Sequence, residues 1–213
     1  MIVYIDAHTH HADRGNPFAV RNLSLEEIES FLKTDKNEFC SAAIHPWEVH
    51  LHSTEILTKI EEALADPRIK AVGECGLDRN SKATIKEQLF FFERQAQFSE
   101  QFSKPLIIHC VAAFNELINL RKKLKPTQNW VVHGFRGKPQ LAKQLLNAGF
   151  AISYGEHFNP ESVAVTPLEK LCIETDESDI PIEEIYKSIA AIKHCRTHEL
   201  NGACNLLKLY VCQ

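Results

Sequence analysis

The chain has 213 residues, of which 44% are hydrophobic and 24% are charged, and its formal net charge is −4. This length suits one α/β domain with a sizeable core, so we expect a single domain over residues 1–213. No run of 18 apolar residues occurs, which argues against a transmembrane helix. The acidic balance excludes a general electrostatic footprint for polyanions, so any nucleic acid would have to be bound locally.

The seven cysteines are an odd number and contain no C-x-x-C pair. The N-terminus also lacks a basic segment followed by a long apolar stretch, which is the pattern of a secretory signal. We therefore expect reduced thiols in a cytoplasmic protein, without a disulfide framework. No heptad pattern or spare apolar stripe is visible, so we expect a monomer with no obligate protein partner and no membrane association.

Apolar runs alternate with helical patterns along the chain. The pattern predicts strands at residues 2–6, 18–23, 39–44, a run ending at Glu74, and 105–109, 130–133, 150–154 and 170–174. It predicts helices at residues 25–32, about 84–103, 114–124, 139–148, 182–193 and 201–210. Ser24 and Glu27 have the spacing of a capping box, and Pro139 suits the first turn of a helix.

Strands that alternate with helices favour an α/β fold, here a TIM-type (β/α) barrel. The barrel would be compact, because such barrels have ~250 residues as a rule. Only a short polar loop with Gly15, Asn16 and Pro17 separates the first two predicted strands. We therefore expect the first crossover helix to be reduced or missing.

Six residues with metal-binding side chains stand at or just past the end of an apolar run. They are His8, His10, Glu74, His109, His133 and Asp176. In a barrel of parallel strands the C-terminal ends meet at one face, where the active sites of this fold lie. We therefore expect these side chains, which are far apart in sequence, to converge at one site.

The spacing and number of these residues favour a pair of ions. His8 and His10 are two residues apart on an extended segment, so they point to the same side and can bind one ion together. An unpaired Glu74 in a buried strand would be costly to ionise without a cation. His109 and His133, each taken alone, are equally compatible with ordinary buried histidines. The full set exceeds the needs of one tetrahedral ion, and a bridging Glu fits two ions about 3.5–4 Å apart.

Glu174 and Asp176 share one face of the last predicted strand, because side chains alternate along a strand. We expect one of these carboxylates to bind a metal and accept a proton. The other would orient a ligand from outside the metal's own coordination.

Seven blocks of sequence together resemble one known family, the TatD-type metal-dependent hydrolases and deoxyribonucleases. The blocks are DAHTH (6–10), AIHPW (43–47), AVGECGLD (71–78), PLIIHC (105–110), VVHGFRG (131–137), AISYG (151–155) and CIETD (172–176). They occur in the family's order and cover nearly the whole chain. The resemblance implies an amidohydrolase-like TIM barrel, two divalent ions, and nuclease activity that often removes nucleotides from a 3′ end.

The resemblance also implies roles for the metal ligands, carried over residue by residue. Glu74 would bridge the two ions. His8, His10 and Asp176 would complete the first ion's set, and His109 and His133 the second. Asp176, bound to the first ion and near its water, would serve as the general base.

The chain departs from the family pattern around the pocket. It is shorter than typical members, and the missing material lies mostly between HTHH and AIHPW. Arg79 and Asn80 stand where the family commonly has aromatic residues, and Arg136 lies in a block that usually reads Cys-Phe-Ser/Thr-Gly. The family's metal ligands therefore carry over to this chain more directly than the family's substrate does.

Several residues near the predicted strand ends are candidates for substrate contact. His45, Arg79 and Arg136 could meet a phosphate, although a turn residue and solvated surface charges are equally ordinary explanations. The rings of Trp47 and Phe135 could stack on a base, because such stacking tolerates any base. For Phe135, packing within the fold is the alternative.

Three classes of function are compatible with these residues. The first is a phosphodiesterase acting on single-stranded DNA, with 3′ exodeoxyribonuclease-like polarity. The second is a hydrolase of small phosphoesters or amides that uses the same metal site, because one fold supports many activities. The third, a non-catalytic metal-stabilised binding protein, would be expected to lack a general base, and Asp176 is present. The two ions could be Zn, Mn, Mg, Co or Ni, because ligand type alone does not decide occupancy.

Overall fold

A computed structural model describes residues 3–12 and 15–209 of the chain. Within them it has eight strands in a single sheet and eight α-helices. The strands are β1 (Asp6–Thr9), β2 (Ala19–Leu23), β3 (Phe39–Ala42), β4 (Ile69–Asp78), β5 (Leu106–Val111), β6 (Trp130–Val132), β7 (Ala151–Tyr154) and β8 (Leu171–Ile173). The helices are α1 (Leu25–Leu32), α2 (Ile56–Leu64), α3 (Ile85–Gln101), α4 (Phe114–Leu124), α5 (Pro139–Asn147), α6 (Pro160–Val165), α7 (Ile182–Lys193) and α8 (Gly202–Leu206).

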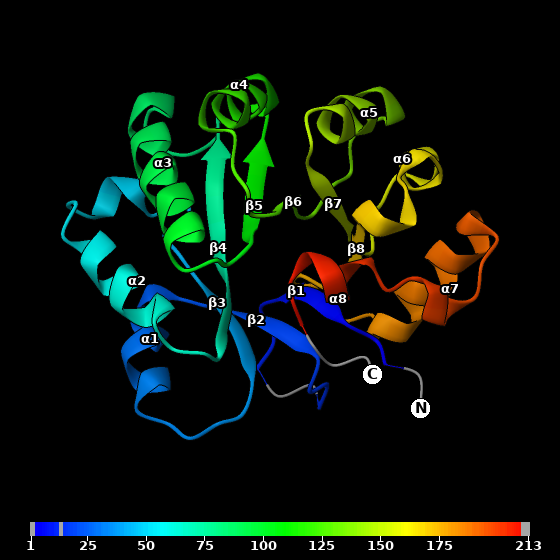
Figure 1. The fold of residues 1–213 in the computed structure, drawn as a ribbon, viewed down its shortest axis with the longest axis horizontal. Helices are drawn as coiled ribbons and strands as arrows, with labels where there is room; N and C mark the ends of the chain where they lie inside the picture. The colour runs from blue at the N-terminus through cyan, green and yellow to red at the C-terminus, as the bar shows by residue number, and fades with distance from the viewer. Residues whose placement is uncertain (1–2, 13–14, 210–213) are drawn as a thin grey trace.

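The sheet curls into a barrel. Its strands follow chain order from β1 to β8, and every neighbouring pair is parallel. An isolated parallel bridge between Thr9 and Asp176 joins the ends of β1 and β8. The helices surround the strands (Figure 1). The prediction of a TIM-type (β/α) barrel is confirmed.

The described residues between β1 and β2 contain no crossover helix, in agreement with the prediction that this helix is reduced or missing. No helix lies in residues 10–12 and 15–18, the described part of the segment between β1 and β2. There the amide of Asn16 donates to the carbonyl of Tyr4, and its side-chain oxygen accepts from the backbone N–H of Phe18. The first strand begins at Asp6, later than the predicted residues 2–6, because ladder pairing with β2 starts there. His8 consequently lies inside the strand.

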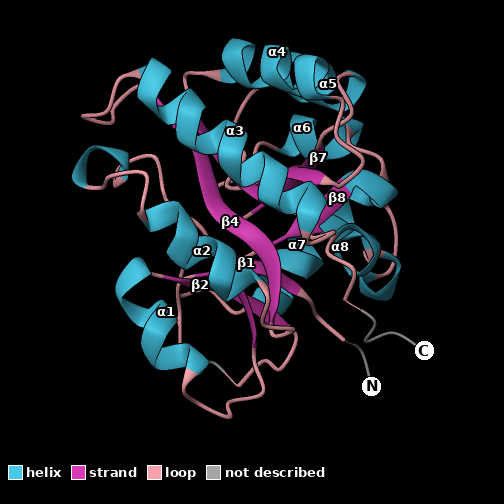
Figure 2. Cartoon of the chain, turned by 60° about the vertical axis from the view of Figure 1, so that its left-hand side comes forward, coloured by secondary structure: helices cyan, strands magenta, loops and turns pink. Residues whose placement is uncertain are grey.

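Helix boundaries follow local capping chemistry closely. The predicted helix at residues 25–32 is α1, and the capping box of Ser24 and Glu27 is present. Pro139 is the first residue of α5, as predicted. Helices α2 and α6 were not predicted from the sequence, and α8 is shorter than the predicted 201–210, of which residue 210 lies outside the described residues. Figure 2 shows α3 lying across β4.

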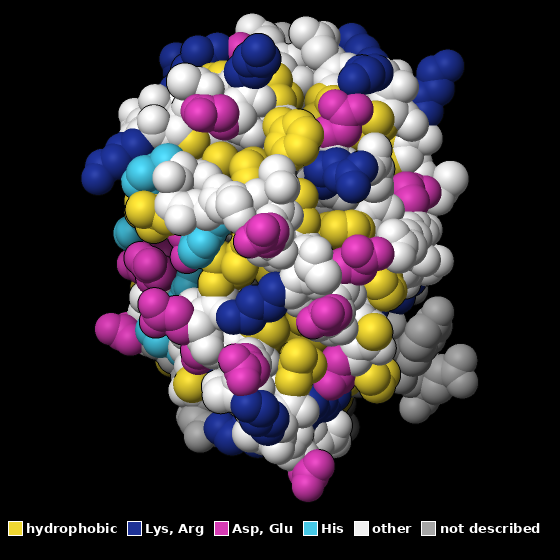
Figure 3. Space-filling model, turned by 90° about the vertical axis from the view of Figure 1, so that its left-hand side faces the viewer, with side chains coloured by type: hydrophobic (Ala, Val, Ile, Leu, Met, Phe, Trp, Pro, Cys, Tyr) yellow, Lys and Arg dark blue, Asp and Glu magenta, His cyan; other side chains and the backbone are white. Residues whose placement is uncertain are grey.

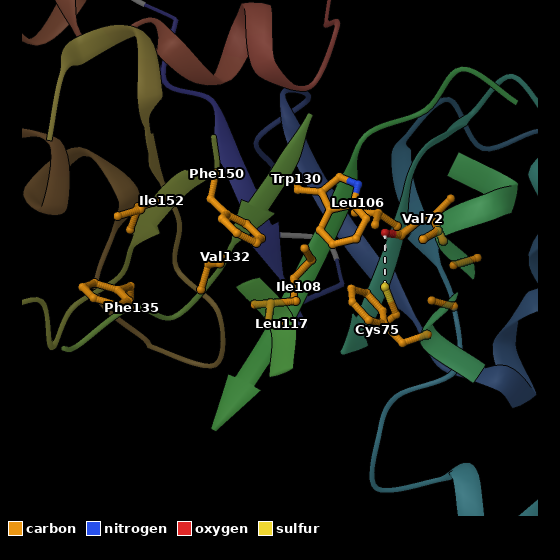
Figure 4. Packing of buried hydrophobic residues seen from close by; sticks show 14 of the residues in the cluster. Val72, Cys75, Leu106, Ile108, Leu117, Trp130, Val132, Phe135, Phe150 and Ile152 are labelled. Carbon is orange, nitrogen blue, oxygen red and sulfur yellow. Dashed lines mark hydrogen bonds between the residues drawn. The ribbon is translucent and has the colours of Figure 1, made fainter. Parts of the chain in front are cut away.

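The core has two layers. The larger layer lies between the sheet and the helices, where Trp130 packs against Phe92 and Phe150 at ring-centroid distances of 5.3 and 5.9 Å. Figure 4 shows Trp130 and Phe150 within this layer. The smaller layer fills the barrel interior and is covered by Leu206 of α8 and by Leu207, which directly follows the helix. Helix α8 closes the end where the strands begin. The other end of the barrel is therefore left for polar side chains.

Strands β4 and β5 approach closely at Gly76. This residue has φ +149°, and a Cβ atom there would overlap the carbonyl oxygen of His109. Only glycine combines this backbone conformation with so close an approach. The glycine thus fixes the distance between the strands that carry Glu74 and His109.

We expect Gly76→Ala to lower the free energy of unfolding far more than Gly15→Ala. Gly15 also has a positive φ, +70°, but its Cβ would meet no atom within 4 Å. The control should therefore cost only the left-handed strain of about 1–2 kcal/mol. Denaturant unfolding of both variants measures the difference. Equal destabilisation would show that the approach of β4 and β5 is not tightly packed.

Candidate metal centre and active site

The six candidate ligands meet at the C-terminal end of the barrel. His8 lies in β1, Glu74 in β4 and His109 in β5. His10 and His133 directly follow β1 and β6, and Asp176 lies three residues past the end of β8. Their ligand atoms form overlapping groups compact enough to hold a metal ion. The six side chains therefore converge as expected, while their role as metal ligands stays a prediction.

Glu74 lies at the centre, and each of its carboxylate oxygens faces a different group. Its Oε2 atom is 3.3 Å from Nε2 of His8 and 3.2 Å from Nε2 of His10. Its Oε1 atom is 2.9 Å from Nδ1 of His109 and 2.7 Å from Nε2 of His133. A carboxylate shared in this way could contact two cations at once.

Asp176 completes the group that contains His8 and His10. Its Oδ1 atom is 3.8 Å from Nε2 of His8 and 3.6 Å from Nε2 of His10. The backbone of Asp176 is left-handed, with φ +55°, an uncommon conformation for a residue other than glycine. Its N–H donates to the carbonyl of His8, and its carbonyl accepts from the N–H of His10. These bonds hold the strained residue beside both imidazoles.

The donor atoms of this group fit a divalent cation. His8 is fully buried, and neither of its ring nitrogens has a hydrogen-bond partner among the described residues. Such orphaned buried atoms are rare and call for an explanation. Two ligands of a tetrahedral ion, each about 2.0–2.1 Å from the metal, would lie roughly 3.3 Å apart. The separations of His8 and His10 from Glu74 match this value.

The charges of the group are strongly coupled. Burial alone would raise the pKa of Glu74, but the charge of His133 and hydrogen bonds from His10 and His109 outweigh it and hold that pKa well below its usual range. Burial likewise disfavours protonation of His133, yet Glu74 and Glu174 together raise its pKa well above normal. A proton on His133 thus stabilises a carboxylate that would otherwise need another cation.

Two carboxylates outside the group orient its imidazoles. Nε2 of His109 is 3.0 Å from Oδ2 of Asp78, so the other nitrogen is free to face Glu74. Nδ1 of His133 is 3.4 Å from Oε1 of Glu174, which also accepts from the N–H of Gly134 at 2.5 Å. Outer partners of this kind fix the tautomer and direction of a ligating histidine. The assignment of Glu174 as the orienting carboxylate stays a prediction.

His45 is held as a hydrogen-bond donor. Its Nδ1 atom accepts the backbone N–H of Trp47 at 3.2 Å, so the proton of a neutral ring must be on Nε2. Nε2 faces Oε1 of Glu74 at 3.3 Å. This tautomer leaves His45 without a free lone pair for a metal, although it belongs to one of the compact donor groups. A contact with substrate remains open to it.

The two candidate arginines have different surroundings. Arg79 forms an ion pair with Glu116 and donates to the carbonyl of Ala112 at 2.9 Å, and it does not line the cavity above the site. Arg136 is exposed and lines that cavity. Of these two candidates, the structure therefore brings only Arg136 to the metal-binding group.

A cavity of about 790 Å³ opens above the six residues, and a second cavity of about 640 Å³ adjoins it. Both are lined by Arg136, Asp176 and Glu177. Glu48 adds further negative charge to the lining of the first cavity, and Glu27 adds a carboxylate that is paired with Arg21 at 2.8 Å. Figure 3 shows histidine side chains gathered among acidic ones toward one edge of the face that it draws.

The family model described as TatD related DNase matches residues 7–204. The chain belongs to this family. Family membership confirms the predicted enzyme class, a TatD-type metal-dependent hydrolase. In the described residues no helix is long and apolar enough to cross a membrane.

Curated relatives of this TatD-family chain include proteins with and without an assigned substrate. It is 28% identical over 179 residues to an uncharacterized metal-dependent hydrolase of Haemophilus influenzae, covering 77% of this chain and 68% of that protein. It is 30% identical over 151 residues to the 3′-5′ ssDNA/RNA exonuclease TatD of Edwardsiella piscicida, covering 65% and 58%. It is 31% identical over 162 residues to the human 3′-5′ RNA nuclease TATDN2, covering 70% and 21%. The chain thus spans less than two thirds of the last two relatives.

Solved structures show the same fold. The crystal structure of YjjV, a TatD homolog from Escherichia coli, superposes with a TM-score of 0.81 at 19% identity, covering 98% of this chain and 96% of that one. A dihydroorotase superposes with a TM-score of 0.66 at 13% identity, covering 97% and 71%. At these identities the likeness concerns the barrel alone.

Sequence reasoning missed two acidic residues of the TatD-family site. Asp78 follows Glu74 by four residues on one strand, so period-two alternation places both on the same face, a signal that was available. Asp6 lies below His8, and its carboxylate accepts from the backbone N–H of Thr175 at 2.9 Å and from its hydroxyl at 2.6 Å. These bonds join β1 to the end of β8 beneath Asp176. No local sequence pattern predicts the pairing of Asp6 with Thr175.

Burial raises the pKa of Asp6 from 3.8 to about 7, although the hydrogen bonds from Thr175 oppose the shift. Between these values the folded protein binds a proton that the unfolded chain has lost, so this group makes stability fall as pH rises. Asp6→Asn should remove that slope, which is at most about 1.4 kcal/mol per pH unit.

Unfolding of metal-free wild type and variant between pH 4 and 8 measures the effect. Asp35→Asn, which changes an exposed carboxylate after α1, serves as the control. Parallel stability profiles for wild type and Asp6→Asn would contradict a protonated Asp6.

Proposed function

We propose that this TatD-family protein is a single-domain phosphodiesterase that depends on two divalent ions and cleaves single-stranded DNA from its 3′ end. The observation that carries the proposal is the position of Glu74, with one oxygen toward His8 and His10 and the other toward His109 and His133. The cytoplasmic location and monomeric state expected from the sequence stay predictions.

In this proposal His8, His10, Glu74 and Asp176 hold the first ion, and Glu74, His109 and His133 hold the second. A bound pair of this kind lowers the pKa of a coordinated water and neutralises charge on a phosphoryl group. The mixed imidazole and carboxylate set is compatible with zinc, manganese, magnesium, cobalt or nickel.

Asp176 has the position that a general base requires. Its side chain keeps 25% of its surface exposed at the floor of the cavity, whereas Glu74 is almost fully buried. The backbone bonds to His8 and His10 fix the direction of the carboxylate. A carboxylate held at the edge of the ligand group can take a proton from a nucleophile in the cavity.

The substrate class rests on the relatives and on the charge of the cavity. Relatives of this chain are named 3′-5′ ssDNA/RNA exonuclease and 3′-5′ RNA nuclease. Arg136 offers one cation for a phosphate, while Glu48 and Glu177 make the rest of the lining acidic. Such a lining favours the end of a strand over a long charged backbone.

The alternative is a hydrolase of small phosphoesters or amides with the same ions. The bounded cavity of about 790 Å³ is the observation that favours it, because this volume lies within the range of small-molecule sites.

We expect Asp176→Asn to lower turnover by about 10²–10⁴-fold, because an amide is a poor proton acceptor of nearly the same shape. Glu177→Gln is the matched control, since it neutralises the adjacent carboxylate of the lining. Metal content should be measured alongside, with two ions expected per wild-type chain. Near wild-type turnover of a fully metallated Asp176→Asn would exclude Asp176 as the base.

We expect single-stranded ends to be cleaved in preference to internal duplex sites, and Arg136→Glu to raise KM more for DNA than for a small chromogenic diester. Product ladders from end-labelled oligonucleotides distinguish 3′ from 5′ attack. If all forms of DNA are inert while a small ester or amide turns over, the alternative function is correct.

A further inference from the structure

Trp47 stands apart from the other aromatic side chains around the cavity. It keeps 56% of its surface exposed and lines the cavity above the metal-binding group. Phe135 lines the same cavity but is only 2% exposed and packs edge-on against Phe114 and Tyr154. Trp47 is the one large hydrophobic side chain in the described lining of this cavity with more than a third of its surface exposed.

The exposed indole is held rigidly. Its Nε1–H donates to Oδ2 of Asp78 at 2.7 Å, and this buried oxygen is also 3.0 Å from Nε2 of His109. The backbone N–H of Trp47 donates to His45. Ser81 further fixes the loop by donating to the carbonyl of Pro46 at 2.7 Å.

These contacts place the ring at a set distance from the site. The Trp47 ring centroid is 5.2 Å from that of His45 and 6.1 Å from that of His109. Both imidazoles face Oε1 of Glu74. A flat group in the cavity could therefore lie on the indole while an attached phosphate reaches the ligand group.

We propose that Trp47 is the stacking surface for the base of a nucleotide next to the scissile phosphate. This inference rests on the proposed function and adds a specificity-determining residue to it. A ring already fixed by Asp78 and His45 loses little conformational freedom when a base stacks on it. Stacking is sequence-tolerant because every base has a π-face.

The charge of the cavity lining favours recognition of a base over recognition of the phosphate backbone. Arg136 is the sole Lys or Arg in the described lining, against Glu48 and Glu177, while the carboxylate of Glu27 is already paired with Arg21. Successive phosphates of a chain therefore find few partners there. Recognition of a base at the strand end supplies affinity that the backbone cannot.

The first test is equilibrium binding followed by tryptophan fluorescence. The chain has two tryptophans, and Trp130 is fully buried, so quenching by a ligand in the cavity reports on Trp47. Titration of the metal-loaded protein with dAMP should quench the emission, whereas 2-deoxyribose 5-phosphate, which lacks the base, should not. Trp47→Leu should weaken dAMP binding about 5- to 150-fold, the equivalent of one base–aromatic stack. Phe90→Leu, at an exposed ring outside the cavity, is the matched control and should bind as wild type.

The second test is cleavage of two oligodeoxynucleotides, one natural and one abasic at its last two 3′ positions. Trp47→Leu should raise KM for the natural strand about 5- to 150-fold and leave KM for the abasic strand unchanged. Trp47→Phe, which keeps a ring but loses the bond to Asp78, should retain much of the preference for the natural strand.

The outcomes separate this inference from the proposed function. A loss of kcat on both strands alike would show that Trp47 acts only through Asp78 and His109, and would overturn stacking. DNA cleavage with no base preference and no quenching would also overturn it while the proposed function stands. Quenching by dAMP without DNA cleavage would support stacking and reject the nuclease.

Discussion

The site depends on one buried carboxylate that is shared between two sets of imidazoles. Glu74 is only 6% exposed, and such burial opposes the ionisation of a carboxyl group. The neighbours that lower this cost of ionisation, His10, His109 and His133, each lie in a strand or directly after one. The N–H of Glu74 donates to Asn22 on β2, and Gly76 lets β5 approach. The strand contacts that close the barrel therefore also determine which charged groups surround Glu74.

The second nitrogen of each imidazole distinguishes the roles of the histidines. His109 and His133 direct one nitrogen outward to Asp78 and Glu174, so a neutral ring that keeps its proton on this outward nitrogen would present a lone pair inward to a metal. His45 accepts a backbone N–H with its outward nitrogen, so its inward nitrogen carries a proton. Three rings that all face Glu74 are therefore not equivalent. Distance to the carboxylate alone would have counted His45 as a ligand.

The positions of the candidate ligands could be predicted because they follow from topology. Parallel strands bring their C-terminal ends together whatever the details of packing, so the ends of apolar runs were sufficient for His133 and Asp176. The capping box at Ser24 was equally readable, because both partners lie within one turn. These features depend on short-range sequence patterns and on the rule that the C-terminal ends of parallel barrel strands meet at one face.

Other features depend on pairings that no local pattern contains. Arg79 stands at a strand end as predicted, but its partner Glu116 is 37 residues further along the chain. The start of β1 at Asp6 is set by its ladder with β2 and by Thr175, 169 residues away. The sequence therefore predicted which residues meet at the site better than it predicted the long-range contacts of the residues around them.

The metal-binding group and the acidic lining around it would act on a phosphate in opposite directions, the first by attraction and the second by repulsion. With two divalent ions in the proposed positions, the four positive charges would exceed the two of Glu74 and Asp176 and attract one phosphate. Asp78 and Glu174 lie just outside and bring this sum back toward zero, and Glu48 and Glu177 make the approach acidic. Attraction of a polyanion is then short in range. A short strand end that carries its own uncharged recognition element, the base, suits this field better than a continuous backbone does.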